Sequence, residues 1–189
     1  MEFKVEKTSI RDLLIITPEI FQDERGFFTE TYRKDKFKEF GLEMEFVQDN
    51  HSKSAKNVVR GLHFQWEPPM GKLMRVTQGA AFLVAVDIRI GSPTLGQWVA
   101  IEASVENRKQ FYAPAGFARG FCVISDFAEI QYKCTGVYTS TKAESGVLWN
   151  DPKIGIKWPV SEPILSKKDE VAQTLDQWLE TADAKNFNY

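Results

Sequence analysis

The sequence predicts a mainly β domain, built as an antiparallel sandwich, jelly roll or barrel with a few short peripheral helices. Short apolar runs follow one another at roughly 8–12-residue spacing, which is typical of strands in such folds. Turn-forming sequences separate these runs, at 91–96 (GSPTLG), 114–116 (PAG) and 151–155 (DPKIG). No long helical pattern lies between the runs, and this excludes a fold of strands alternating with crossover helices.

The clearest predicted strand covers residues 82–90. Its even positions are all apolar, whereas its odd positions change to Asp87 and Arg89, so we expect a half-buried strand with the even side chains on the buried face. Residues 73–77 are expected to form its hairpin partner, with the turn near Gly79. Further strands are predicted at 97–103, 111–113, 120–124, 128–134 and 146–149.

Two segments have a helical pattern. Residues 34–40 place Phe37 and Phe40 on one face and are followed by Gly41, which predicts a short helix with a C-terminal glycine. After Asp169, apolar residues recur at helical spacing at 171, 175, 178 and 179. We therefore expect a helical tail over about 170–189.

Length and charge restrict the class of protein. The 189 residues fit one domain over 1–189, because no repeat, charge block or low-complexity tract interrupts them. With 24 Lys+Arg against 26 Asp+Glu, the chain lacks the basic excess that attracts nucleic acid or anionic lipid. The apolar run at 13–16 is too short for a signal sequence or a membrane span. We expect a cytoplasmic protein with no nucleic-acid or membrane partner.

Three polar residues lie where strand alternation predicts an inward side chain, in an interior that is otherwise apolar. Tyr132 shares a strand face with Ile130, Lys72 shares one with Met74, and His63 lies on the face of its strand that points away from its apolar neighbours. Each also has a structural interpretation: a core tyrosine that binds one backbone acceptor, a lysine at a strand end, and a histidine with satisfied hydrogen bonds.

Histidine is the side chain best suited to act as a general base near neutral pH, which makes His63 the candidate. Such a base needs a carboxylate to fix its tautomer, and Asp169 is available, although Ser166 or Asp169 could instead cap the C-terminal helix. A metal-binding cupin would need a His-x-His pair and a further histidine. The chain reads His-x-Gln at 63–65 and has 2 histidines, so no metal site is predicted.

Eight motifs occur in one order, and together they closely resemble the dTDP-4-dehydrorhamnose 3,5-epimerases, a metal-independent, cupin-like family. They are DERGFFTET (23–31), FVQDNHS (46–52), VVRGLHFQ (58–65), GKLMRV (71–76), PAGFARGF (114–121), YKCT (132–135), DPKIGIKWP (151–159) and LSKKD (165–169). The resemblance runs from Arg11 to about Asp169. It implies a cupin-type antiparallel jelly-roll β-barrel.

The resemblance implies catalytic roles for four residues. The histidine of RGLHxQ is the family's base and is paired with the aspartate of LSxKD, so His63 and Asp169 would form this pair. Tyr132 would be the acid on the opposite face of the sugar, and Lys72 would lie near the developing enolate oxygen. No metal or redox cofactor is implied.

Other motif positions match residues that bind substrate in the family. Arg25 and Arg60 correspond to residues that meet the diphosphate and the sugar, and Tyr138 to an aromatic residue that stacks on thymine. Further substrate contacts are implied for Glu30, Gln48, Asn50, Glu144 and Lys168. Family members are homodimers, and Arg25, Phe27 and Glu30 would reach the neighbouring subunit's site.

The implied activity is inversion of C3 and C5 of dTDP-4-dehydro-6-deoxy-D-glucose to give dTDP-4-dehydro-L-rhamnose. Protons alpha to the C4 ketone would be abstracted from one face and returned from the other. One residue implied to contact substrate departs from the family pattern PxGFAHGF: Arg119 replaces the histidine. Two alternatives therefore remain. One is a mono-epimerase that acts at C3 or C5 of a related sugar, and the other is a nucleotide-sugar-binding cupin without catalysis.

Overall fold

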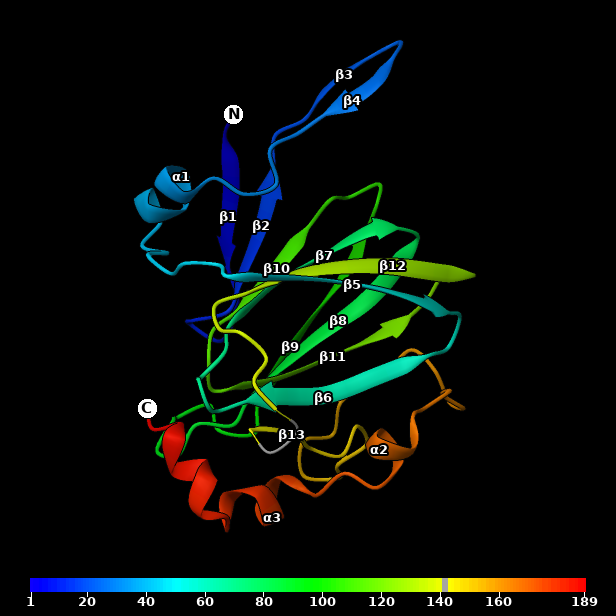
Figure 1. The fold of residues 1–189 in the computed structure, drawn as a ribbon. Coiled ribbons are helices and arrows are strands. Elements are labelled where there is room, and N and C mark those ends of the chain that lie inside the picture. Colours follow the sequence, from blue (N-terminus) through cyan, green and yellow to red (C-terminus); the bar gives the residue numbers. More distant parts are fainter. Residues whose placement is uncertain (141–142) are drawn as a thin grey trace.

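Two antiparallel sheets pack face to face in the computed structural model, which describes residues 1–140 and 143–189 (Figure 1). The six-stranded sheet has the order β1 (Phe3–Lys7), β2 (Leu14–Pro18), β10 (Gln110–Ala113), β7 (Lys72–Gln78), β12 (Phe127–Cys134) and β5 (Gln48–Ala55). The five-stranded sheet has the order β13 (Glu144–Gly146), β6 (Val59–Gln65), β11 (Phe117–Val123), β8 (Ala80–Asp87) and β9 (Trp98–Ser104). Strands β3 (Phe21–Asp23) and β4 (Gly26–Phe28) form a separate hairpin. The predicted mainly β, cupin-like fold is confirmed.

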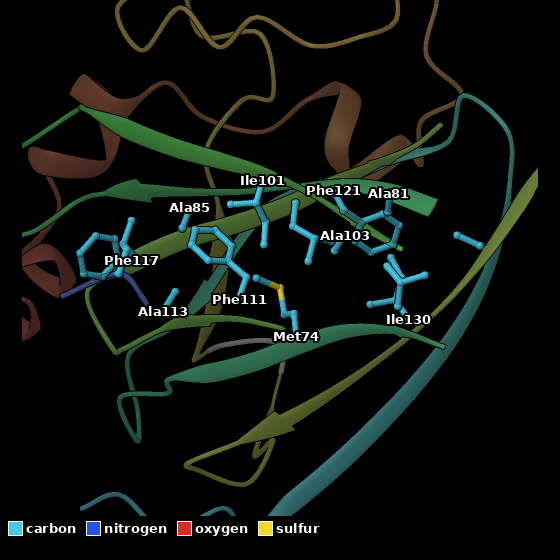
Figure 2. Packing of buried hydrophobic residues seen from close by; sticks show 14 of the residues in the cluster. Met74, Ala81, Ala85, Ile101, Ala103, Phe111, Ala113, Phe117, Phe121 and Ile130 are labelled. Atoms are coloured by element: carbon cyan, nitrogen blue, oxygen red, sulfur yellow. The ribbon is translucent and has the colours of Figure 1, made fainter. Parts of the chain in front are cut away.

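Apolar side chains fill the space between the sheets and form the barrel core (Figure 2). Met74 and Ile130 point into this core from the six-stranded sheet, and Ala85 and Phe121 do so from the five-stranded sheet. Tyr132 packs against the same cluster, as its alternation with Ile130 predicted. The inner faces of β7 and β12 therefore carry both the core and the inward polar side chains.

Strand β8 is buried on both faces, so the prediction of a half-buried strand is wrong. Its odd residues Leu83 and Ala85 belong to the barrel core, whereas the even residues Val84 and Val86 pack in a second cluster with the C-terminal segment. The strand also ends at Asp87, before the predicted residue 90. A strand covered on both sides carries apolar residues on both faces, so its alternation does not identify the inner one.

Strands β7 and β8 do not form the predicted hairpin, because they belong to different sheets. β7 pairs with β10 and β12, whereas β8 pairs with β9 and β11. The chain turns between them at Gly79, which has φ +72° and where an added Cβ would lie 2.1 Å from the carbonyl oxygen of Phe127. The turn is where the sequence predicted it, but it takes the chain from one sheet to the other.

The other strand predictions hold with one shift. Strands β9, β10, β11 and β12 overlap the predicted segments closely. The strand expected at 146–149 is instead β13, which ends at Gly146. The following residue, Val147, exchanges backbone hydrogen bonds with Leu62 on β6 and forms an isolated bridge to Gln173. Leu148 then donates to Gln173, so the chain leaves β6 after Val147.

A short helix, α1 (Lys34–Glu39), forms where it was predicted and buries Phe37. The tail is not one helix: it comprises α2 (Lys167–Glu170), α3 (Leu175–Leu179) and a 3-10 helix (Ala182–Asn186). Each begins at a hydroxyl N-cap, namely Ser166, Thr174 and Thr181. Leu175 and Trp178 pack in the second cluster with outward residues of the five-stranded sheet, but Val171 is 81% exposed.

Within the described ranges, every helix is too short and too polar to cross a bilayer.

Candidate active site

A cavity of about 120 Å³ lies between the two sheets, next to the barrel core. The six-stranded sheet contributes Lys72 from β7 and Tyr132 from β12 to its wall. The five-stranded sheet contributes His63 from β6 and Arg119 from β11, and these two residues are register partners. Three of the four residues predicted to be catalytic therefore line one cavity, although they come from three separate strands.

The fourth predicted catalytic residue, Asp169, contacts His63 from helix α2. Its Oδ1 lies 2.6 Å from Nε2 of His63, and Asp169 is 3% exposed. Burial acts to raise the pKa of this carboxyl, but hydrogen bonds from His63, Ser166 and Gly61 outweigh it and hold the pKa below the ordinary value. Asp169 is therefore ionised and accepts the Nε2 proton, which leaves Nδ1 of His63 as the unprotonated nitrogen.

The N-terminus of α2 fixes Asp169 for this contact. Ser166 is the N-cap, and its hydroxyl accepts a hydrogen bond of 3.2 Å from the backbone N–H of Asp169. Of the two possible caps in the sequence, the structure thus uses Ser166. The Asp169 carboxylate remains available for His63.

Lys72 and Tyr132 lie beside each other on neighbouring strands. The Lys72 ammonium is 4.8 Å from the centre of the Tyr132 ring. Burial and then the positive charge of Arg119 lower the pKa of Lys72 to about 8. Burial raises the pKa of the Tyr132 phenol, against a hydrogen bond from Asn50 that lowers it. Neutral pH lies below both of these pKa values, so the site holds a protonated lysine and a protonated phenol.

Several predicted substrate-binding residues lie around this cavity. Lys168, next to Asp169, forms an ion pair of 2.9 Å with Glu144, whose Cα lies opposite Gln65 on β6. Gln48 donates to the side chain of Asn50 (3.0 Å) and accepts from the backbone N–H of Tyr138 (2.8 Å). The structure thus joins the predicted binding residues into two polar groups. Arg60 also lines the cavity, where it is exposed and donates to Ser54.

Arg25, Phe27 and Glu30 are not brought to this cavity. Arg25 and Phe27 lie on the β3–β4 hairpin, which projects from the barrel on the side away from β6 and α2 (Figure 1). Arg25 forms an ion pair with Asp23, Phe27 is 56% exposed, and Glu30 bonds with Arg33. In a single chain these three predicted residues are separate from His63.

The sequence reasoning missed five other residues that line the cavity, namely Ser52, Met74, Gly120, Phe121 and Ile130. Ser52 lies two positions after Asn50 on β5, so strand alternation was a signal that could have found it. Phe121 lies in the PAGFARGF motif but reads as an ordinary core residue, and no signal separated it from one. In residues 1–140 and 143–189, no three His, Cys, Asp or Glu side chains are close enough together to hold a metal ion.

Comparison with known proteins identifies relatives over almost the whole chain. A family model described as dTDP-4-dehydrorhamnose 3,5-epimerase matches residues 7–177. The protein of that name from Salmonella typhimurium is 54% identical over 180 residues, which is 94% of this chain and 98% of the relative. A dTDP-4-dehydrorhamnose 3-epimerase from Streptomyces niveus is 41% identical over 162 residues, or 85% of this chain and 78% of the relative.

A solved structure agrees with these sequence matches. The dTDP-6-deoxy-D-glucose-3,5-epimerase from Legionella pneumophila, in complex with dTDP-4-keto-L-rhamnose, has a TM-score of 0.91 and 45% identity, and the match covers 97% of both chains. Family model, sequence relatives and solved structure therefore point to the same enzyme family. The chain belongs to the dTDP-4-dehydrorhamnose 3,5-epimerase family.

Proposed function

We propose that this isomerase inverts C3 and C5 of dTDP-4-dehydro-6-deoxy-D-glucose to give dTDP-4-dehydro-L-rhamnose. The observation that carries the proposal is the cavity in which the His63–Asp169 pair, Lys72 and Tyr132 meet. Both carbons flank the C4 ketone, so their protons are acidified and removal of either one gives an enolate. A base, an acid and a cation are what inversion at such carbons needs.

His63 acts as the base in this proposal. Its Nδ1 takes the proton from C3 or C5, and Asp169 stabilises the imidazolium that forms. Lys72 in its protonated form stabilises the enolate oxygen. Tyr132 delivers a proton from the opposite face, and its raised pKa keeps the phenol protonated at neutral pH.

The nucleotide part of the substrate is assigned to the residues around the cavity. Arg60 is exposed at the cavity wall, and its planar guanidinium suits a diphosphate. Tyr138, which is 48% exposed, offers a ring for thymine to stack on. Gln48, Asn50, Glu144 and Lys168 complete the polar surroundings of the sugar and nucleotide. The solved relative from Legionella pneumophila carries a dTDP-sugar, which supports this substrate class.

A homodimer is part of the proposal, with Arg25, Phe27 and Glu30 acting in the neighbouring site. The β3–β4 hairpin supports it, because Phe21, Phe27 and Phe28 are all more than half exposed there. Mixing an H63A chain with an R25A chain tests it, since the mixed dimer regains one site with both residues only if Arg25 acts in trans. Recovery of activity on mixing supports both the dimer and the action of Arg25 in the neighbouring site. Absence of recovery while both variants stay folded and form mixed dimers contradicts the action in the neighbouring site, and a monomeric wild type contradicts the dimer.

Reaction in deuterated water separates double from single inversion. We expect deuterium at both C3 and C5 of the product, read by NMR. Label at one carbon only would contradict the proposal and favour the mono-epimerase alternative, which the Streptomyces niveus relative keeps open because it is named a 3-epimerase. Exchange at either carbon refutes the non-catalytic alternative.

We also propose a cytoplasmic location, which the two free cysteines, Cys122 and Cys134, support. Cell fractionation tests this location independently of the activity.

A further inference from the structure

Arg119 carries a buried guanidinium with free hydrogen-bonding capacity. The residue is 3% exposed, and its Nη1 donates to the carbonyl oxygen of Met70 at 2.7 Å. Its Nε and Nη2 are buried and have no partner among the described residues. A buried donor without a partner costs about 1–3 kcal/mol, and more when it is charged. The fold therefore holds a cation whose remaining donors find no acceptor within residues 1–140 and 143–189.

The charged side chains that line the cavity beside Arg119 are all positive. Among the described residues of its wall, Arg60, Lys72 and Arg119 carry positive charge and none is acidic. The carboxylate of Asp169 is occupied by His63, and that of Glu144 by Lys168. Positive charge in a water-poor site stabilises negative charge that develops during reaction. The two deeper cations are Lys72 and Arg119, because Arg60 is exposed.

Depth distinguishes the part of the substrate that each arginine meets. Arg60 at the exposed end of the cavity suits the diphosphate, which enters with the solvent-facing nucleotide. Arg119 is the register partner of His63 on the β6–β11 ladder, and it lines the same cavity as this base, which removes the proton. The acceptor near this base is on the sugar. Its strongest acceptor is the C4 oxygen when the enolate has formed.

We propose that Arg119 and Lys72 together form a two-cation oxyanion site for the C4 oxygen of the enolate, an inference that rests on the proposed epimerase function. The C–H electron pair at C3 or C5 becomes the enolate double bond, and the carbonyl electrons move to the C4 oxygen. The proton goes to His63. A proton from Tyr132 then adds to the same carbon as the C4 ketone re-forms, and exchange with solvent returns His63 and Tyr132 to their starting protonation states. Arg119 donates hydrogen bonds throughout and transfers no proton.

The same arrangement links Arg119 to the protonation of Lys72. Burial and the Arg119 charge lower the pKa of Lys72 to about 8. The charge of Lys168 also lowers this pKa, whereas Cys134 and Glu144 raise it. Lys72 must be protonated to stabilise the oxyanion, so activity falls as the pH rises through this value. Removal of the Arg119 charge raises the pKa of Lys72 and moves this alkaline limb to higher pH.

The test measures deuterium incorporation at C3 and C5 by R119Q, R119K and wild type at saturating substrate, together with the affinity for dTDP, which lacks the sugar. We expect R119Q to lose about 100-fold in exchange rate, the usual loss for one oxyanion donor. We expect its dTDP affinity to stay within threefold of wild type and its alkaline limb to move upward. R119K keeps the charge and should exchange at least tenfold faster than R119Q. R11Q, at an exposed arginine outside the site, is the matched control.

Three results overturn the inference. They are exchange by R119Q within threefold of wild type, an equal loss in folded R119K and R119Q, and a loss of dTDP affinity with normal exchange at saturation. The last result would place Arg119 at the diphosphate. R119M replaces R119Q in the same comparisons if R119Q does not fold. Absence of exchange in the wild type is a separate outcome, because it would refute the proposed function itself.

Discussion

Replacement of Asp169 by asparagine tests the base most directly. The Asp169–His63 hydrogen bond is 2.6 Å long, buried and made by an ionised carboxylate. Hydrogen bonds to charged groups contribute about 1.5–3 kcal/mol. Since about 1.4 kcal/mol changes a rate tenfold, the lost stabilisation of the imidazolium alone slows proton abstraction by about 10- to 150-fold.

Asparagine adds a second effect, because its amide nitrogen can donate to Nε2 of His63. That bond favours the tautomer with the proton on Nδ1, which is the nitrogen that must accept the substrate proton. We therefore expect D169N to lose about 10²–10⁴-fold in exchange at both C3 and C5. The affinity for dTDP should not change, because Asp169 faces His63 and not the nucleotide.

Deuterium exchange followed by NMR measures the loss, and thermal unfolding checks that D169N is folded. The matched control is D176N, since Asp176 is an exposed aspartate on α3 that pairs with Lys153. D176N should exchange at the wild-type rate. Exchange by folded D169N within threefold of wild type would refute the assignment of Asp169 as the partner of the base.

Four further outcomes are expected. H63A should lose exchange at both carbons but still bind dTDP in calorimetry; retained turnover would contradict its role as base. Y132F should lose more in product formation than in loss of the substrate protons, and equal losses would argue against a dedicated acid. D87A should lower the free energy of unfolding by about 3–5 kcal/mol, because it removes a buried carboxylate that accepts from Arg89, Ser92 and Thr94 and leaves Arg89 with Asp12 alone, while activity per folded molecule stays unchanged. Because the pKa of Asp169 is lower in the folded than in the unfolded state, the ionised carboxylate stabilises the fold above the ordinary carboxyl pKa of about 4. This stabilisation is lost as the pH falls through the pKa of Asp169 in the folded state. Wild type and D169N should therefore differ in Tm at pH 7 and converge in acid.

Strands β7 to β12 and the turn at Gly79 could be predicted from the sequence because alternation and turn chemistry are local, whereas no strand was predicted for β1, β2 or β5. The facing of β8 could not, because the cluster of Leu175 and Trp178 buries its outer side and makes both faces apolar. Nor could the partner of β7, since Gly79 marks a turn equally well whether the chain stays in one sheet or crosses to the other. Both errors arise from contacts between segments far apart in the chain.

In the candidate site too, local patterns predicted some features, whereas contacts between distant segments could not be predicted. Inward alternation predicted that Tyr132 and Lys72 would face the interior, and the structure places them 4.8 Å apart, ring centre to ammonium. The pairing of His63 with Asp169 spans 106 positions. Chemistry alone made Asp169 one candidate partner that could equally cap a helix, and only the family resemblance assigned it to His63, because no local pattern encodes the pair. Arg119 looked like a substitution of one polar residue for another. Only the packing shows that its guanidinium is buried with unpartnered donors.

The placement of Asp169 depends on backbone contacts at both ends of its segment. Before α2, Ile164 exchanges backbone hydrogen bonds with Asn57 (2.9 Å) and Val59 (3.1 Å), at the start of the strand that carries His63. After α2, the carbonyl of Gln173 accepts from Leu148 at 2.8 Å. A four-residue helix could not hold a carboxylate by itself. Because main-chain bonds anchor both ends, a side-chain change at Asp169 leaves the segment in place, and the loss expected in D169N is one of proton chemistry and not of position.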